Sequence, residues 1–553
     1  MHGNIKIVIG KMRTVVIITS IFFSLCTYSF LTKKHKLTSS DDFIGRYQIN
    51  PDKLDYAIIA ANFALTNQFP VSGYILDTSA YKVKTYWKLN HFFLDVFKEN
   101  GSVTTLARPP LYPLFVGYMY KVLGYKIYYN QLLNILLLAF ITGCMPFVGY
   151  QVWGRIGYIA GVFAASIYMT LGFDNLEVYS VDIQLFITIV FFFIFWGAIS
   201  IKPSSQPPSY LKLGLLIGVG LLTKPIMVMM PFLYLGYFAV KYPPEQRKLL
   251  QKRILFLFAG IIIVILPYTI FINIKQISTK NQREAWIERV AQSRKMDMVN
   301  DWKDYPPCKD FDSDTCDNFK LDFTKSILIT HSSNASFMCI TNSGGEQLLH
   351  QNNEKSLDGA PLHFEWMFVK NSKYNQDTFN RNTFVKILSF YRYYPSYIFK
   401  IPIARIIYSA KTYPLIFWLA GALWGLSVIQ RRATDIKNYR CKTWILLTVI
   451  FLFGLSYYLC FVPFKYASVL YFLPLFLVGV VLFKKSDEPD LSIAYPILWL
   501  SIFLLLILIF GDERFTWVAM PVSCLCGTYF SLNFIKVSIL GVLNAAKGST
   551  AQP

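Results

Sequence analysis

The feature that most constrains this chain is a series of apolar runs, each about 20 residues long, that recur from near the N-terminus almost to the C-terminus. A helix of this length crosses the hydrocarbon core of a bilayer and satisfies its own backbone hydrogen bonds there. The 553-residue chain is 54% hydrophobic and only 16% charged, whereas soluble domains are about 25% charged. This composition excludes an ordinary soluble enzyme, a disordered chain and a disulfide scaffold.

We predict an all-α integral membrane protein with about 12 transmembrane helices, interfacial helices in a first outer segment and a larger outer segment of mixed structure. The predicted spans are 13–31, 127–150, 156–172, 182–201, 212–223, 225–241, 254–273, 411–430, 443–461, 465–483, 491–510 and 515–537. The short pair 212–223 and 225–241 meets at Pro225, so it forms either two spans or one kinked element. The first span is interpreted as a retained anchor rather than a cleaved signal peptide.

The expected organisation has three parts. Residues 1–273 form a transmembrane catalytic module that includes the first outer segment, 32–126. Residues 274–410 form the second outer segment, and residues 411–553 form C-terminal transmembrane helices.

Positive charge sets the predicted orientation. The net charge of +22 could indicate a nucleic-acid partner. The basic residues flank the apolar runs, however, which favours a membrane protein that binds no nucleic acid. They fall on one side if the spans alternate, and that side is cytoplasmic by the positive-inside rule. These residues are Lys6, Lys11, Arg13, Lys202, Lys212, Lys241, Arg247, Lys248, Lys252, Arg253, Arg431, Arg432, Lys437, Arg440, Lys442, Lys484 and Lys485. We expect the bacterial inner membrane with a periplasmic active site, and the endoplasmic reticulum membrane as second choice.

Two motifs stand out in the first outer segment. Residues 54–69 have the apolar spacing of an amphipathic helix, with Asp55 at its beginning. Arg108 precedes two prolines and an apolar run that is too short for a span. That run suits a helix lying in the interface, and its tyrosines are expected at headgroup level, namely Tyr112, Tyr118 and Tyr120.

The order of these motifs resembles the GT-C membrane glycosyltransferases, in the branch of the protein O-mannosyltransferases and the bacterial lipid A aminoarabinose transferases. Further stretches are similar to that family in the same order: EVYSVDIQLF (177–186), LLTKPIMVMMP (221–231), CITNSGGEQLLHQNN (339–353) and FKYASVLYFLPLF (464–476). The chain departs from the family at 55–56, where Asp-Tyr stands for the frequent Asp-Glu. It also has Lys224 and Lys465 where arginine is frequent, and an insertion at 276–338.

The resemblance implies a donor with one sugar on a polyprenyl phosphate and an acceptor hydroxyl on a lipid, a glycan or a protein. Transfer needs a base for the hydroxyl proton and cations for the departing phosphate. Asp55 matches the family's catalytic acid and is the expected general base, with inversion at the sugar carbon. The alternative is that Asp55 only caps the helix that follows it.

Three basic residues match positions that would bind the donor phosphate. Arg108 could bind two phosphate oxygens, or it could be an interfacial residue that snorkels. Lys224 lies in an apolar sequence beside Pro225, where a charge is costly and usually faces a cavity. Lys465 begins a predicted span, and a snorkelling lysine is an equal alternative there.

Two acids lie at the start of the fourth predicted span, Asp182 as its first residue and Glu177 five residues earlier. Glu177 and Asp182 are expected either to position the acceptor or to bind a divalent cation such as Mg²⁺ or Mn²⁺. A solvated outer loop is the alternative. No other cofactor is expected, and the histidines lack the spacing of a zinc site.

The second outer segment contributes a predicted loop and a predicted disulfide. Asn342, Gly344 and Gly345 match the family's loop that returns to the substrate, although such a sequence would also make a plain turn. Cys308 and Cys316 would form a disulfide if that side of the membrane is oxidising.

Two other functions compete with transfer of a sugar. A transporter or flippase for lipid-linked sugars would show inverted repeats and charges in mid-membrane. An oligosaccharide polymerase or ligase would not be expected to carry the early Asp55 and Arg108.

Overall fold

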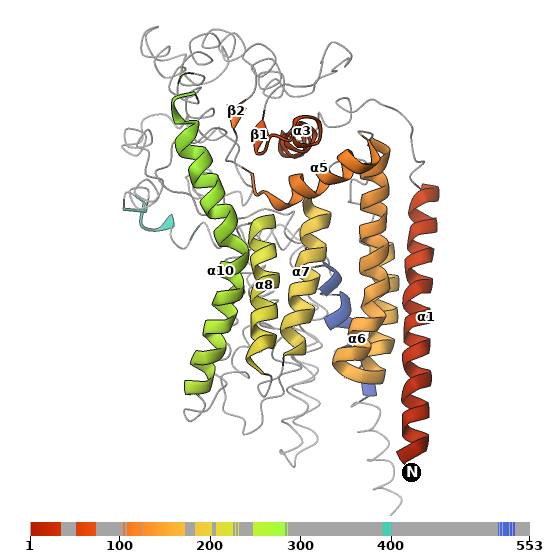
Figure 1. Cartoon of the computed structure of the whole chain (residues 1–553). Coiled ribbons are helices and arrows are strands. Elements are labelled where there is room, and N and C mark those ends of the chain that lie inside the picture. The colour runs from red at the N-terminus through yellow and green to blue at the C-terminus, as the bar shows by residue number, and fades with distance from the viewer. Residues whose placement is uncertain are drawn as a thin grey trace, which may run out of the picture.

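The described part of the chain is a bundle of upright helices that is covered at one end by two shorter crossing helices (Figure 1). This computed structural model describes residues 2–34, 51–72, 103–104, 108–124, 127–171, 183–201, 206–224, 227, 230–231, 247–282, 285, 391–392, 394–397, 400, 518, 520–522, 524–529, 531–532 and 535–536. Within these ranges, three helices are long and apolar enough to cross a membrane: Met12–Lys33, Tyr128–Met169 and Gln251–Lys275. The chain is therefore a helical membrane protein, and the total of about 12 spans stays a prediction.

Helix α1 (His2–Lys34) packs against α6 (Ile127–Leu171) through small polar side chains. The hydroxyls of Thr27 and Thr142 are 2.9 Å apart, and the Ser24 hydroxyl donates to the Ala139 carbonyl at 3.0 Å. These bonds satisfy hydroxyls that would be costly in lipid. On the opposite face of α1, Leu25 is exposed, as expected of a lipid-facing position.

Helix α6 is a hairpin of two helices, as the separate spans 127–150 and 156–172 predict. Its backbone leaves the helical conformation at Gly154 (φ 65°, ψ −142°), in the region that favours glycine. Around this turn, Gly149 and Gly157 pack so closely that a Cβ on either would overlap the other's backbone. The two halves of α6 are therefore antiparallel and in close contact beside the turn.

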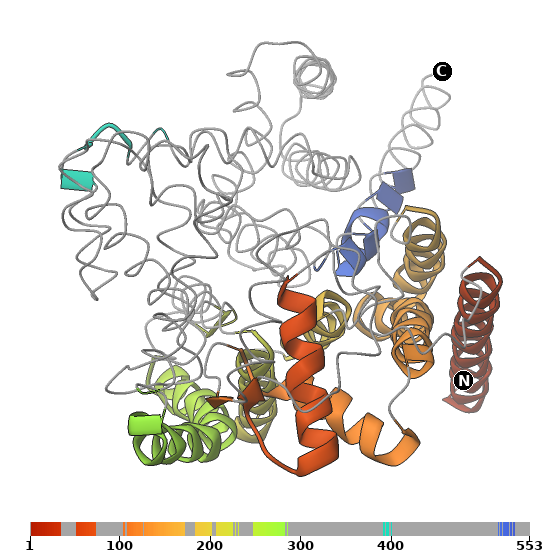
Figure 2. The same cartoon turned by 90° about the horizontal axis from the view of Figure 1, so that it is seen from above.

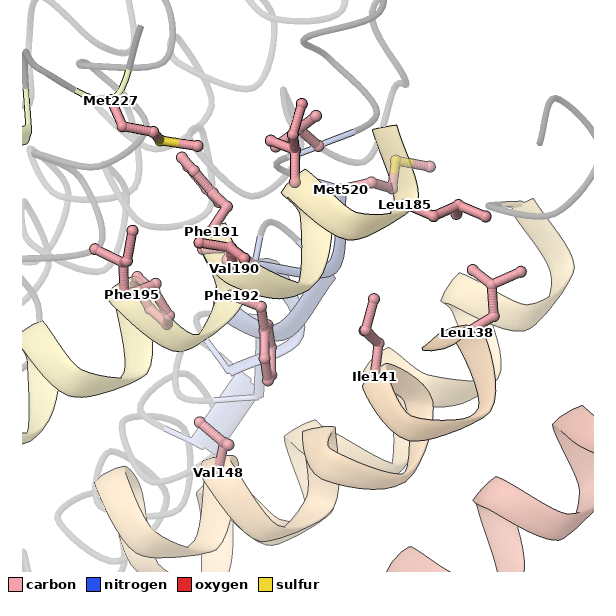
Figure 3. Close-up of a cluster of buried hydrophobic side chains, with 14 of the residues drawn as sticks. Leu138, Ile141, Val148, Leu185, Val190, Phe191, Phe192, Phe195, Met227 and Met520 are labelled. Carbon is pink, nitrogen blue, oxygen red and sulfur yellow. The ribbon is translucent and has the colours of Figure 1, made fainter. Parts of the chain in front are cut away.

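Helix α7 (Ile183–Ser200) packs against α6 and α8, and helical residues near the C-terminus lie beside α6 and α7 (Figure 3). Phe191 and Phe192 are buried there, and Met520 lies close to Leu185. The Thr528 hydroxyl also donates to the Ala160 carbonyl at 2.9 Å. The end of the predicted last span is thus part of the same core as the first helices.

Helices α8 (Pro207–Thr223) and α10 (Arg247–Ser278) pack side by side and point the same way. Gly214 meets Leu257, and Gly218, one turn later, meets Val264. Thr223 and Arg247 therefore lie at opposite ends of the bundle, as expected if residues 225–241 cross the membrane. That predicted span lies largely outside the described residues.

The covering layer consists of α3 (Pro51–Thr66) and α5 (Leu111–Leu123), with a short antiparallel pair of strands, β1 (Val71–Ser72) and β2 (Val103–Thr104). Both helices were expected from the sequence, whereas the strand pair was not. Figure 2 shows α3 and α5 lying over the ends of the upright helices.

The expected position of the α5 tyrosines is wrong for two of the three. Tyr112 and Tyr120 are buried in the protein, and Tyr120 shares a hydrogen bond with Asn130 of α6. Only Tyr118 is exposed, at 58%. Tyr112 and Tyr120 lie on the face of α5 that packs against the rest of the protein, because the upright helices lie beneath this helix.

Basic residues lie at both ends of the upright helices. The start of α1, the turn of α6 and the starts of α8 and α10 share the end opposite α3 and α5 (Figure 1). Basic residues at that end include Arg13, Arg155, Lys212 and Arg253. Basic residues also lie at the end covered by α3 and α5, among them Lys33, Lys224 and Lys275. The orientation in the membrane therefore stays a prediction.

The contact between α8 and α10 makes a test of the bundle. We expect Gly214→Val to destabilise the protein by about 1–3 kcal/mol, because its side chain would overlap the Leu257 carbonyl and Gly260. Gly197→Ala on α7 is the control, since its Cβ would meet only Leu216 at 3.4 Å and Leu213 at 3.7 Å. Thermal unfolding in detergent measures both variants, and equal melting temperatures would contradict the close packing.

Candidate functional site

Asp55 lies within α3 rather than at its cap. The helix begins at Pro51, and proline is favoured in the first helical position because it has no N–H to leave unsatisfied. Asp55 follows in the second turn, too far along to cap the first N–H groups. The capping alternative for Asp55 is therefore wrong. The side chain itself lies outside the described residues.

Arg108 lies against the residue that follows Asp55. Its guanidinium carbon is 5.6 Å from the centre of the Tyr56 ring, a cation–π contact, and the side chain is half-buried. Tyr56 is buried and meets the ring of Tyr112 edge to face, with the centroids 5.6 Å apart. Arg108 thus rests on a packed aromatic surface, unlike a residue that only snorkels.

Further contacts join α3 and α5, which cross at an angle (Figures 1 and 2). Phe63 meets Tyr118 edge to face at 4.9 Å, and the Lys121 ammonium lies 4.8 Å from the Phe63 ring centre. Lys121 also donates a hydrogen bond to the side chain of Asn67, just after α3 ends. Because the contacts follow the same order along both helices, the first turns of α3 lie near the residues before α5.

Lys224 directly follows the last helical residue of α8, Thr223. Its backbone is extended (φ −152°, ψ 117°), as expected of a residue before proline. Its N–H donates to the Gly220 carbonyl at 2.8 Å, and its carbonyl accepts from the Met227 N–H at 3.1 Å. The helix break expected at Pro225 is therefore seen in α8, which ends two residues before this proline.

The position of Lys224 also has a structural explanation. A cation is favoured at the C-terminus of a helix by the helix dipole. The end of α8 lies at the same end of the bundle as α5, which contacts α8 (Figure 1). The half-buried Lys224 therefore lies at the same end of the bundle as Arg108.

Helix α7 also reaches this end of the bundle. It begins at Ile183, directly after Asp182. The ring of Phe186, in its first turn, lies 5.5 Å from Tyr112 and 5.2 Å from Phe115, measured between centroids. The start of α7 is thereby fixed beneath the start of α5.

Several predicted site residues lie outside the described part of the chain: Glu177, Asp182, Asn342, Gly344, Gly345 and Lys465. The same holds for the predicted disulfide of Cys308 and Cys316. Among the described residues, no group of three or more His, Cys, Asp or Glu side chains is placed to hold a metal ion. Binding of Mg²⁺ or Mn²⁺ by Glu177 and Asp182 therefore stays a prediction.

The sequence did not single out the aromatic side chains that join these elements. Tyr56, Tyr112 and Phe186 connect α3, α5 and α7 beside Arg108. Tyr56 was noted only as a departure from the frequent Asp-Glu pair. The sequence did contain a signal for this role. Neighbouring residues on a helix point in different directions, so an aromatic residue directly after the candidate acid can pack into the protein while the acid does not.

The described arrangement has a definite chemical character. A guanidinium and an ammonium lie half-buried at one end of the bundle, where partial exclusion of water strengthens their attraction for an anion. A carboxylate-bearing residue, Asp55, lies one position from the residue whose ring the guanidinium contacts.

No protein-family model matches the sequence, and neither a curated protein nor a solved structure was found to match it.

Proposed function

We propose that this protein is a membrane glycosyltransferase of the GT-C type, which moves a sugar from a polyprenyl-phosphate donor to an acceptor hydroxyl. The reaction takes place at the end of the bundle covered by α3 and α5. On the predicted orientation, this end faces the periplasm of a bacterial cell. The resemblance of the sequence motifs supplies the reaction class.

The observation that carries the proposal is the contact of Arg108 with Tyr56. It brings the guanidinium beside α3, one residue from Asp55, although more than 50 residues separate the two in sequence. Lys224 lies at the same end of the bundle. The helix that carries Asp55, the Arg108 side chain and the end of α8 at Lys224 thus lie at one end of the bundle, which supports transfer from a lipid phosphate.

In the proposed reaction, Asp55 accepts the proton of the acceptor hydroxyl. The hydroxyl oxygen then forms a bond to the anomeric carbon, and the bond from this carbon to the phosphate oxygen breaks. The electron pair stays on the polyprenyl phosphate, whose charge Arg108 and Lys224 stabilise. Attack opposite the leaving group inverts the configuration at the anomeric carbon.

The position of Lys224 favours an enzyme over a transporter. A flippase would carry charge near the middle of the membrane, where its substrate passes. Lys224 instead caps the end of α8, and Arg108 precedes the covering helix α5. Both positions suit a phosphate held at the boundary of the bilayer.

A direct assay tests the proposal. The full chain is reconstituted in liposomes and incubated with a panel of radiolabelled polyprenyl-phosphate sugars and a membrane fraction as acceptor. We expect one label to move onto acceptor material with release of polyprenyl phosphate. Intact donor that only changes leaflet would support a flippase instead, and label that stays on every donor would overturn the proposal.

A further inference from the structure

An aromatic seam descends from the candidate site along the outside of the bundle. We use this name for Phe115 of α5, Phe186, Phe193 and Trp196 of α7, and Phe140 and Phe147 of α6. Phe115, Phe140 and Phe147 are 41%, 48% and 38% exposed, and the three α7 residues are half-buried. The seam is therefore accessible from the side of the bundle.

Ring contacts connect most of the seam. The Phe115 and Phe186 centroids are 5.2 Å apart at its upper end. Lower down, Phe193 lies 5.8 Å from Phe140 and 5.8 Å from Trp196, and Trp196 lies 5.9 Å from Phe147. The half-buried Ile189 falls between Phe186 and Phe193 on the same face of α7.

The seam begins beside the candidate phosphate ligand. Phe186 meets Tyr112, Tyr112 meets Tyr56, and Arg108 rests on the Tyr56 ring. At 1.5 Å per residue, α7 carries the seam about 15 Å from Phe186 to Trp196, roughly half the thickness of a hydrocarbon core. Arg108 is thus connected to the upper end of the seam through two buried rings, Tyr56 and Tyr112.

We propose that the aromatic seam binds the chain of an isoprenyl phosphate, with its phosphate at Arg108. The inference rests on the proposed function for the class of donor and adds the surface that selects its lipid. An isoprenoid chain carries flat double bonds and methyl branches at regular spacing. Flat π-systems pack well in offset or edge-on contact with aromatic rings, which a saturated acyl chain cannot reproduce.

The seam differs from other lipid-facing surfaces of the described bundle in this connection to a cation. Phe163 on the second half of α6 and Phe271 on α10 are also exposed. Within the described part of the chain, Phe163 meets no other aromatic ring and Phe271 meets only Tyr268 of its own helix. These two residues therefore serve as matched positions for a control.

Binding of tritiated undecaprenyl phosphate to the full chain in phosphatidylcholine nanodiscs tests the proposal. We expect saturable binding, and the double variant Phe193→Leu/Trp196→Leu should weaken it about tenfold. Leucine keeps the surface apolar, so insertion in the membrane is preserved. The control double variant Phe163→Leu/Phe271→Leu should bind within about twofold of the wild type.

Two further measurements decide between chains and between surfaces. Phosphatidic acid, which joins saturated acyl chains to a phosphate, should compete poorly with undecaprenyl phosphate. A farnesyl phosphate with a photoreactive benzophenone should label peptides that contain residues 186–196 or 140–147. Equal competition by phosphatidic acid, equal losses in the control variant, or labelling confined to α10 would each overturn the inference.

The assay is independent of sugar transfer. Selective binding at the seam without transfer of any sugar would leave the inference standing and defeat the proposed enzyme. Sugar transfer by a Phe193→Leu/Trp196→Leu variant with unchanged donor affinity would support the proposed enzyme and defeat the inference about the seam.

Discussion

Replacement of Asp55 by Asn should lower sugar transfer by about 100- to 10,000-fold, the usual contribution of a general base. The amide of asparagine has nearly the same shape as the carboxylate but cannot accept the proton of the acceptor hydroxyl. Since Asp55 lies inside α3 rather than at its cap, the exchange removes no capping bond from the start of the helix. The rate of transfer from the labelled donor at saturating substrate measures the effect.

The matched control for this prediction is Asp52→Asn. Asp52 also lies near the start of α3, so its exchange removes the same charge from the same helix. We expect the control to transfer sugar at close to the wild-type rate. Binding of undecaprenyl phosphate should survive in both variants, because the phosphate ligands are unchanged. Near-normal transfer by the Asp55→Asn variant would show that Asp55 is not the general base.

The sequence predicted the helical elements well where the pattern of apolar residues was long or sharply ended. The spans 127–150 and 156–172 correspond to the two halves of α6, because Gly154 permits the turn between them. The end of α8 at Thr223 follows from the proline after Lys224, which excludes the α conformation for the residue before it. Such local effects act within a few residues and can be read directly from a sequence.

The contacts between elements could not be predicted in the same way. The apolar spacing of α5 identified a helix, but it did not show that Tyr112 and Tyr120 face the protein. A buried interfacial face and a lipid-facing one have the same pattern, because both are apolar. The contact of Arg108 with Tyr56 depends on how α3 lies on α5, which no local pattern specifies.

The polar contacts inside the bundle explain how this arrangement is maintained. The hydrogen bond of Tyr120 with Asn130 ties the end of α5 to the start of α6, while Phe186 ties its beginning to α7. Helix α5 is therefore fixed at both ends to upright helices. A site built on α5 is therefore positioned by the upright helices beneath it.

Replacement of Arg108 by Ala should raise the KM for the lipid donor about 10- to 100-fold, as expected for loss of a charge-assisted bond to phosphate. The KM for the acceptor should change little, because the proposal assigns this guanidinium to the phosphate of the donor. Arg108→Lys should recover only part of the donor affinity, since an ammonium keeps the charge but not the two-point geometry. Steady-state kinetics with each substrate varied in turn separates these effects.

The control for Arg108 is Lys121→Ala on the same covering helix. Lys121 also lies over an aromatic ring of α3, at 4.8 Å from the Phe63 centroid, but at the far end of α5. Loss of a cation–π contact that only supports packing should therefore affect both variants alike. A selective loss of donor affinity in the Arg108 variant identifies a phosphate ligand. Equal losses for donor and acceptor, or equal losses in the Lys121 variant, would reduce Arg108 to a residue that holds α3 on α5.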